Sequence, residues 1–237
     1  MMKKTLLKSL AALTAFAGST AAYGQLTPED ITVETDFAFE SEYSFRGSKL
    51  GGPSLQPGME IGVKDAYFGT WMSMPLKRNE GAGDNEVDFY AGYVFALNDM
   101  VELDVGYTYY WFPEGGSERE PYIGAAFDVF LDPAVYLFYE TEGDILTVEV
   151  SGGYAYDLQE IGLAGFELDV GAYLGFIADT DESEDWFYYG LSADLVYALN
   201  DVTTFSIGPR LAGNSDDDLG GEPQQQLWWG TAVNMAF

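Results

Sequence analysis

The chain ends with "LWWGTAVNMAF" (residues 227–237), in which larger and smaller side chains alternate up to the last position. Trp229, Val233, Met235 and Phe237 fall on one face of an extended chain, because successive side chains of a strand point to opposite sides. The sequence thus finishes on an apolar strand although its formal net charge is −29. In a closed β-barrel the last strand pairs with the first and leaves no free edge, so it can run to its final residue. This ending therefore favours a barrel in a membrane.

The other end of the chain has the features of a secretory signal. Three lysines precede or interrupt the apolar run "LLKSLAALTAFAGSTAA" (6–22), which is too short and too alanine-rich for a permanent membrane helix. The run leads into Ala-Tyr-Gly (22–24), which fits the small-residue pattern of a cleavage site. We therefore expect residues 1–24 to be a cleaved signal peptide and residues 25–237 to form a single exported domain.

The composition argues against several classes of protein. The sequence contains no Cys, which excludes disulfides, thiolate metal sites and an acylated lipoprotein anchor. It contains no His, the residue on which outer-membrane hydrolases and acyltransferases rely as a general base, so we expect no enzymatic activity. The acidic charge argues against nucleic acid as a partner, and no cofactor is expected.

Alternation with a period of two residues recurs along the exported part of the chain, whereas the helical period is absent. The pattern predicts an all-β protein, a transmembrane antiparallel up-and-down β-barrel of about 12 strands. The expected strands are residues 33–45, 55–63, 66–74, 87–95, 101–111, 123–131, 135–139, 146–154, 166–176, 187–197, 203–211 and 229–237. Residues 66–74 are apolar on both faces, so their facing is undecided.

Short and long connections take turns between these strands, as expected of an outer-membrane barrel with tight turns at one end and longer loops at the other. Short turns are expected near residue 64 and at 96–99, 131–133 and 198–201. Long, acidic and glycine-rich loops are expected at 75–86, 113–120, 178–185 and 212–226. Two connections break the pattern, because 141–144 is short where a long loop is expected and 157–165 is long where a short turn is expected.

Charged residues within the predicted strands fall on the face opposite the large apolar side chains. A charge on the lipid side of a barrel costs roughly 2 to 4 kcal/mol near the midplane, which keeps that face apolar. The apolar side chains are therefore expected to face lipid and the charged ones a central lumen. The candidate lumen-lining residues are Glu34, Asp36, Glu40, Glu42, Arg46, Asp88, Glu102, Asp104, Asp128, Glu140, Asp169, Asp194 and Arg210.

A soluble protein can also alternate, with its apolar face turned inward. Two observations favour the membrane over that alternative. The large apolar side chains of 12 strands would overfill a small soluble barrel, whereas small and acidic residues suit a wider lumen. The tryptophans also fall at strand ends assigned to the outer rim, where aromatic girdles meet lipid headgroups. These residues are Trp71, Trp111, Trp186, Trp228 and Trp229.

An acidic lining with few basic residues leaves two functions open. A water-filled lumen would attract cations, which describes a small diffusion channel with a cation preference. A closed interior would instead require neutral or paired carboxyl groups, which describes a structural or surface-interaction barrel without an open pore. The acidic runs 179–185 and 214–218 lack the spacing of an EF-hand calcium loop, so we assign no metal ligands.

The segment "FESEYSFRGSKLGGPSLQPGMEIG" (39–62) resembles the opening signature of the TorF-like porin family of proteobacterial outer-membrane proteins, also described as Gcw_chp. The segment "EVDFYAGYVFALNDMVELDVGYTYYWFP" (86–113) is similar to the family's next blocks. Glu42 departs from the family pattern, which usually has Asp there. The resemblance implies an outer-membrane barrel with channel activity. It transfers no catalytic or binding residues, because the family's substrate is unsettled.

Within this resemblance, Ser41, Arg46 and Gly47 are the positions of most interest. Arg46 is expected to pair with a lumen acid such as Glu42 or Asp88. Alternatively, Gly47 simply permits a turn and Arg46 balances local charge.

The expected partners follow from this fold. They are outer-membrane lipid, small solutes or cations, and the barrel-insertion machinery. The alternating strand that ends at Phe237 resembles the C-terminal signal by which outer-membrane barrels are recognised for insertion.

Overall fold

The computed structural model describes residues 27–77, 84–179, 184–215 and 225–237. The expected signal peptide and the acidic residues 180–183 and 216–224 lie outside the described residues. Among the residues it does describe, no helix is long and apolar enough to cross a membrane.

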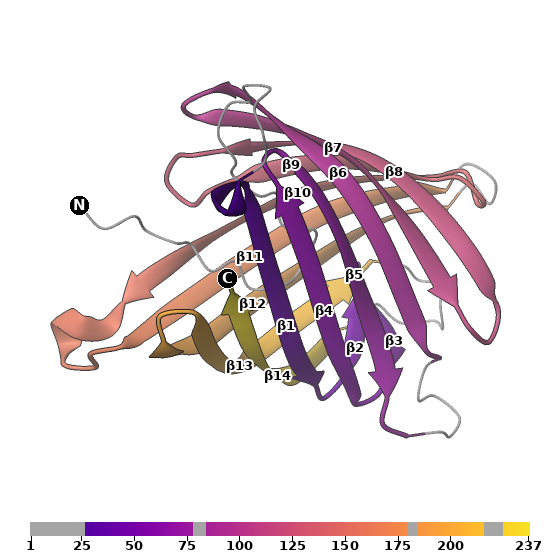
Figure 1. Cartoon of the computed structure of the whole chain (residues 1–237). Helices are drawn as coiled ribbons and strands as arrows, with labels where there is room; N and C mark the ends of the chain where they lie inside the picture. Colours follow the sequence, from indigo (N-terminus) through magenta and orange to yellow (C-terminus); the bar gives the residue numbers. More distant parts are fainter. Residues whose placement is uncertain (1–26, 78–83, 180–183, 216–224) are drawn as a thin grey trace.

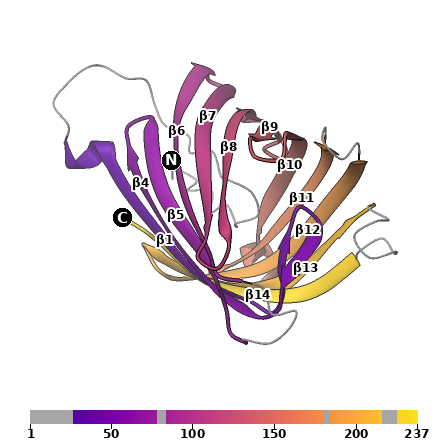
Figure 2. The same ribbon diagram turned by 90° about the vertical axis from the view of Figure 1, so that its right-hand side faces the viewer.

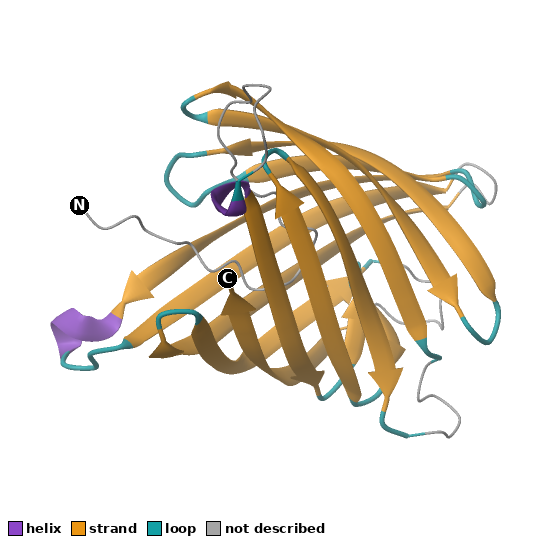
Figure 3. Cartoon of the chain, in the orientation of Figure 1, coloured by secondary structure: helices purple, strands orange, loops and turns teal. Residues whose placement is uncertain are grey.

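Twelve antiparallel strands form a closed barrel (Figure 1). Strands next to each other in the wall follow one another along the chain, and β1 closes the ring against β14. The barrel strands are β1 (Ile31–Glu40), β4 (Ser54–Val63), β5 (Ala66–Pro75), β6 (Glu86–Asn98), β7 (Val101–Phe112), β8 (Gly116–Phe127), β9 (Ala134–Glu140), β10 (Ile145–Asp157), β11 (Phe166–Asp179), β12 (Glu184–Asn200), β13 (Thr203–Asn214) and β14 (Gln225–Ala236). The predicted fold is therefore confirmed, and strands dominate the described residues (Figure 3).

Among the described residues, one hairpin and two short 3-10 helices are not part of the barrel wall. A separate two-stranded hairpin consists of β2 (Tyr43–Phe45) and β3 (Ser48–Gly51), both within the connection from β1 to β4. The 3-10 helix η1 (Pro28–Asp30) precedes β1, and η2 (Leu158–Ile161) lies between β10 and β11.

Two predicted strands differ most from the observed bounds. The first was expected over 33–45, but pairing with β14 ends after Glu40, where Ser41 exchanges bonds with Trp229, and the chain then turns into the hairpin. The sixth was expected over 123–131, but β8 starts at Gly116 and ends at Phe127. The expected loop 113–120 is therefore only the turn 113–115, because the charged residues after it belong to the wall.

The connections show the expected asymmetry only in part. At the end that carries the chain termini, two-residue turns join β4 to β5, β6 to β7 and β12 to β13. At the opposite end, the connection 41–53 is long, but 113–115 and 141–144 are tight. Loop length alone is thus a weak guide to the two ends of this barrel.

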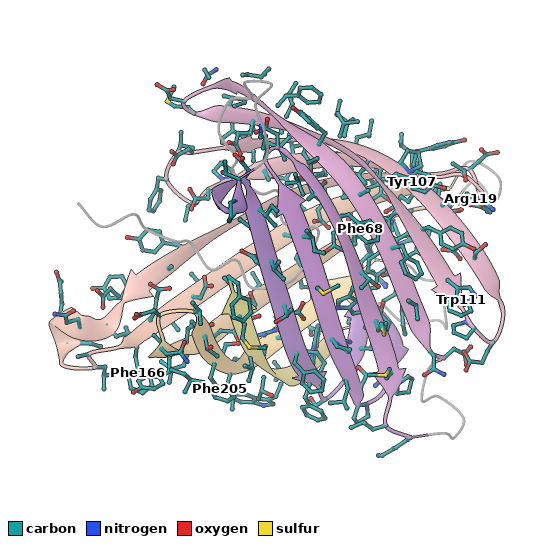
Figure 4. The ribbon with its side chains drawn as sticks, viewed as in Figure 1. Phe68, Tyr107, Trp111, Arg119, Phe166 and Phe205 are labelled. Atoms are coloured by element: carbon teal, nitrogen blue, oxygen red, sulfur yellow. The ribbon has the colours of Figure 1, made fainter. Side chains whose placement is uncertain are left out.

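The barrel has its apolar side chains outside and its polar side chains inside. Phe68 is 51% exposed, whereas Asp194 and Glu120 are 0% and 1% exposed. Phe68, Tyr107 and Trp111 point away from the barrel wall in Figure 4. Because soluble proteins bury apolar side chains, this inverted pattern is expected of a wall that faces lipid.

The tryptophans fit the predicted girdle at only two positions. Trp111 and Trp229 are exposed on the outer face. Trp71, Trp186 and Trp228 have the strand parity of the inward-facing residues; Trp228 Nε1 donates to Glu40 Oε2 at 2.7 Å. Position near a strand end does not decide the face, since one residue further along the strand points to the other side.

Inside the barrel, tyrosine rings lie across glycines of the neighbouring strand. A Cβ added to Gly106 would lie 2.2 Å from Tyr122 Oη, a separation that forces the ring to move. An aromatic ring that covers a glycine compensates for the side chain that glycine lacks in a strand. The directly paired residues are Gly69–Tyr90, Tyr67–Gly92, Gly106–Tyr122, Gly124–Tyr136, Tyr173–Gly190 and Gly175–Tyr188.

We predict that Gly106→Ala lowers the free energy of unfolding by about 1 to 3 kcal/mol, because the added Cβ displaces Tyr122 and its hydrogen bond to Tyr67. Denaturant titration of the folded barrel in detergent micelles measures this loss. Gly115→Ala is the matched control, since nothing lies within 4 Å of the added Cβ there. Equal stability of the two variants would show that the covered glycines are not needed.

Candidate functional site

The β2–β3 hairpin folds against the inner face of the barrel. Asn214 in β13 donates from Nδ2 to Gly47 O at 3.1 Å and to Ser48 Oγ at 2.9 Å. Ser44 Oγ donates to Gln226 Oε1 of β14 at 3.0 Å. Figure 2 shows the hairpin beside β12 and β13, away from the ends of β1 and β4 that it connects. The connection from β1 to β4 therefore crosses the interior at one end of the barrel.

Gly47 permits the tight turn of this hairpin. Its φ is 76°, in the left-handed region that favours glycine, and a Cβ there would lie 2.3 Å from Gly213 O. This geometry agrees with the alternative in which Gly47 permits a turn. Ser41, also singled out, is placed at the end of β1, where its Oγ accepts a bond from Trp229 N at 2.9 Å.

Arg46 anchors the hairpin to the opposite wall. Its guanidinium makes two bonds to Glu120 of β8, from Nη1 to Oε2 at 2.7 Å and from Nη2 to Oε1 at 2.9 Å. Tyr110 also donates to Glu120 Oε1 at 2.8 Å. The rings of Phe45 and Phe138 lie 4.7 and 4.8 Å from Arg46 Cζ. A bidentate, aromatic-flanked arginine of this kind is held in one geometry.

The predicted partners of Arg46 were wrong. Glu42 pairs with Lys49 within the same hairpin, and Arg46 reaches Glu120, a residue expected in a loop. Burial opposes the charge of Arg46, but the Glu120 carboxylate outweighs it and raises the pKa of the guanidinium above its ordinary value.

A second set of polar contacts joins β5, β7, β8 and β9 inside the barrel. Asp104 accepts from Tyr67 Oη at 2.8 Å and from Tyr136 Oη at 3.0 Å. The hydroxyls of Tyr67 and Tyr122 are 2.6 Å apart. Because β5 and β8 are not neighbours in the wall, these contacts show that the side chains converge on the barrel interior.

Arg210 forms a third polar contact inside the barrel. It lies 2.8 Å from Asp194 and 3.9 Å from Glu40. Among the described residues, both interior arginines, Arg46 and Arg210, are thus paired with carboxylates of the wall.

Most of the predicted lumen residues lie at inward-facing strand positions, which alternate with the exposed apolar ones. One of the predictions needs correction, because Asp128 is exposed beyond the end of β8. Glu42 and Arg46 belong to the connection that holds the hairpin and not to a wall strand, although the Arg46 side chain reaches the interior at Glu120. The inward-facing strand positions include Glu34, Asp36, Glu40, Asp88, Glu102, Asp104, Glu140, Asp169, Asp194 and Arg210.

Several interior residues differ from what the sequence pattern predicts. Glu118 and Glu120 were assigned to a loop because they follow a Pro-Glu-Gly-Gly run, although their alternation with Ser117 and Arg119 continues the strand. The inward tyrosines were missed as well. Most of them can be recognised in the sequence because they are separated from acidic residues of the same strand by an even number of positions, so that both point to the same face.

Carboxylates outnumber basic groups inside the barrel. In the part of the chain that the structure describes, no group of three or more His, Cys, Asp or Glu could hold a metal ion. The inward carboxylates are instead spread along the wall, bonded to tyrosines and arginines or facing one another.

Comparisons with known proteins agree with this architecture. The family model described as "Bacterial protein of unknown function (Gcw_chp)" matches residues 25–206. No curated protein sequence matches the chain.

Solved outer-membrane barrels have a similar fold. The KdgM porin aligns with a TM-score of 0.56 and 11% identity, covering 87% of this chain and 99% of its own. The NanC porin aligns with a TM-score of 0.53 and 12% identity, covering 86% of this chain and 98% of its own. An outer-membrane channel from Pseudomonas putida F1 aligns with a TM-score of 0.53 and 11% identity, covering 92% of this chain and 100% of its own. Identities this low show the shared fold alone. With the family model over most of its length and a closed 12-stranded barrel, this chain belongs to the Gcw_chp family and is an integral outer-membrane protein with a porin-like fold.

Proposed function

We propose that the protein is a diffusion channel of the outer membrane that prefers cations. The observation that carries this proposal is the charge of the barrel interior, where carboxylates outnumber arginines and both interior arginines already have carboxylate partners. A wall with this excess attracts cations and repels anions, and the surrounding low-dielectric barrel strengthens the field. The similarity to porins supports the channel, and the acidic wall supports its preference.

The interior charge argues against transferring the ligand of a porin with a similar fold to this protein. One structure of KdgM is described as a complex with disordered oligogalacturonate, an oligomer of acidic sugars. An acidic wall would repel such a polyanion, so the shared fold does not carry this ligand over. We infer that the solutes here are cations or small neutral molecules.

The β2–β3 hairpin supports a narrow channel. It crosses the interior and is fixed at its tip by the Arg46–Glu120 pair and by Asn214. Side chains held across a barrel reduce the cross-section that remains for solutes. We infer that the narrowest part of the path lies beside this hairpin.

A second candidate is a structural barrel without an open pore. It is favoured by the burial of interior carboxylates, since Asp104 is 2% exposed and both of its oxygens accept bonds from tyrosines. Such groups could fill the interior and stabilise the barrel instead of facing water.

Planar bilayers separate these two functions. We expect the purified protein to produce conductance steps, and in a salt gradient we expect a reversal potential of the sign set by cations. An absence of steps at high protein concentration would favour the structural barrel. A reversal potential of the opposite sign would refute the role given to the acidic wall.

We predict that Glu120→Gln reduces the cation preference, because it removes one negative charge and leaves the positive charge of Arg46 unpaired. The double variant Arg46→Gln/Glu120→Gln removes both charges and is expected to restore most of the preference. The permeability ratio of potassium to chloride, taken from reversal potentials, measures both effects. Glu142→Gln, in an exposed turn, is the control. A ratio that is the same in all four proteins would show that solutes do not pass near this pair.

A further inference from the structure

Asp88 lies at the centre of a row of side chains that crosses four strands. Trp71 in β5 is directly opposite Asp88 in β6, Asp88 is opposite Tyr110 in β7, and Tyr110 is opposite Glu118 in β8. Direct cross-strand neighbours share one face of the sheet and their side chains contact. The Asp88 carboxylate is therefore flanked by an indole ring on one side and a phenol ring on the other.

Asp88 is buried without a full set of partners. The residue is 8% exposed, and none of the described residues donates a hydrogen bond to its Oδ1 atom. Buried polar atoms are nearly always bonded, so an unpartnered carboxylate oxygen indicates a place for a donor.

The charged groups around Asp88 do not supply that donor. Glu86, Glu118 and Glu120 all oppose its negative charge. Glu86 accepts a bond from Tyr43 at 2.8 Å, and Glu120 holds both Arg46 and Tyr110. Within the described ranges, this part of the wall thus has four carboxylates around one guanidinium, and that guanidinium is already paired with Glu120.

Aromatic rings of the hairpin face the rings beside Asp88. The centroid of the Tyr43 ring is 5.6 Å from that of Trp71, and the centroid of Phe45 is 6.3 Å from that of Tyr110. Carboxylates combined with aromatic faces are the groups that bind organic cations, through charge-assisted hydrogen bonds and cation–π contacts. Arg46 of the hairpin is itself bound in this way two strands further along the wall, between two rings and the Glu120 carboxylate of β8.

We propose that Asp88, together with Trp71 and Tyr110, binds the guanidinium or ammonium group of a small organic cation. The inference rests on the proposed function and deepens it, because it names a class of solute and a place on the path. A cation with N–H groups fits better than a metal ion, since Oδ1 lacks a donor and no metal-binding cluster occurs within the described ranges. The hairpin covers this row, so the solute enters as Tyr43 and Phe45 move aside.

Binding can be measured without any current, by isothermal titration calorimetry of the folded barrel in detergent micelles with methylguanidinium. We expect Asp88→Asn to weaken the binding by about tenfold or more, as expected for the loss of a charge-assisted hydrogen bond. Tetramethylammonium, which has no N–H donor, is expected to bind more weakly than methylguanidinium. Asp201→Asn, in the exposed turn between β12 and β13, removes the same charge far from the site and is the matched control.

Trp71→Leu provides a second variant if Asp88→Asn does not fold. It keeps the carboxylate and is expected to weaken binding about threefold or more through the lost cation–π contact. An absence of binding to the unmodified protein would overturn the inference, as would equal binding by Asp88→Asn and Asp201→Asn. Cation-selective conductance without methylguanidinium binding would refute this inference alone. Binding without conductance would refute the channel and leave the site in place.

Discussion

A β-sheet within hydrocarbon has no water to bond the N–H and C=O groups along its edges, so the sheet must close on itself. Here the closure is the pairing of β1 with β14, from Glu34 opposite Ala236 to Glu40 opposite Gly230. Val33 and Phe237 add a reciprocal pair of backbone bonds at one end of this seam, at 3.2 and 2.9 Å. Every other feature depends on this ring, because only a closed wall has an outer face for lipid and an inner face that is hidden from it.

Closure also determines which side chains the inner face can hold. The interior receives half of the residues of every strand, and large charged side chains at all of these positions would crowd one another. The glycine–tyrosine pairs relieve this crowding, since each ring lies over a position that has no side chain. The same tyrosines carry hydroxyl groups that bond to interior carboxylates such as Asp104 and Glu149. One residue type thus fills space and satisfies polar groups, which explains how an acidic interior is compatible with a stable barrel.

The fold could be predicted from the sequence because lipid enforces a strict alternation, as the strand expected at 166–176 and found as β11 shows. The predictions that were wrong concern residues whose place is determined by contacts inside the barrel as well as by the alternation. Glu118 and Glu120 resemble a solvated loop, yet in an inverted barrel charges are ordinary strand residues. Trp71 made its strand apolar on both faces, because its ring meets Tyr43 of a hairpin that packs inside. The hairpin itself could not be predicted, since alternation continues through Tyr43 and Phe45 while the partners that draw them inward lie far along the chain.

The hairpin changes the balance of charge inside the barrel. Without it, the described part of β6 and β8 would present the neighbouring carboxylates of Glu86, Asp88, Glu118 and Glu120 to the interior with no basic residue beside them on that face. Arg46 neutralises only Glu120, and it does so at the tip of a segment whose other contacts are hydrogen bonds from single side chains such as Asn214 and Ser44. The ion pair is therefore the strongest contact between hairpin and wall. Arg46 pairs with one carboxylate of this group, Glu120, and Asp88 is left without a donor among the described residues. In the proposed channel, the ion pair that holds the hairpin across the interior therefore also determines which carboxylate would bind a second cation.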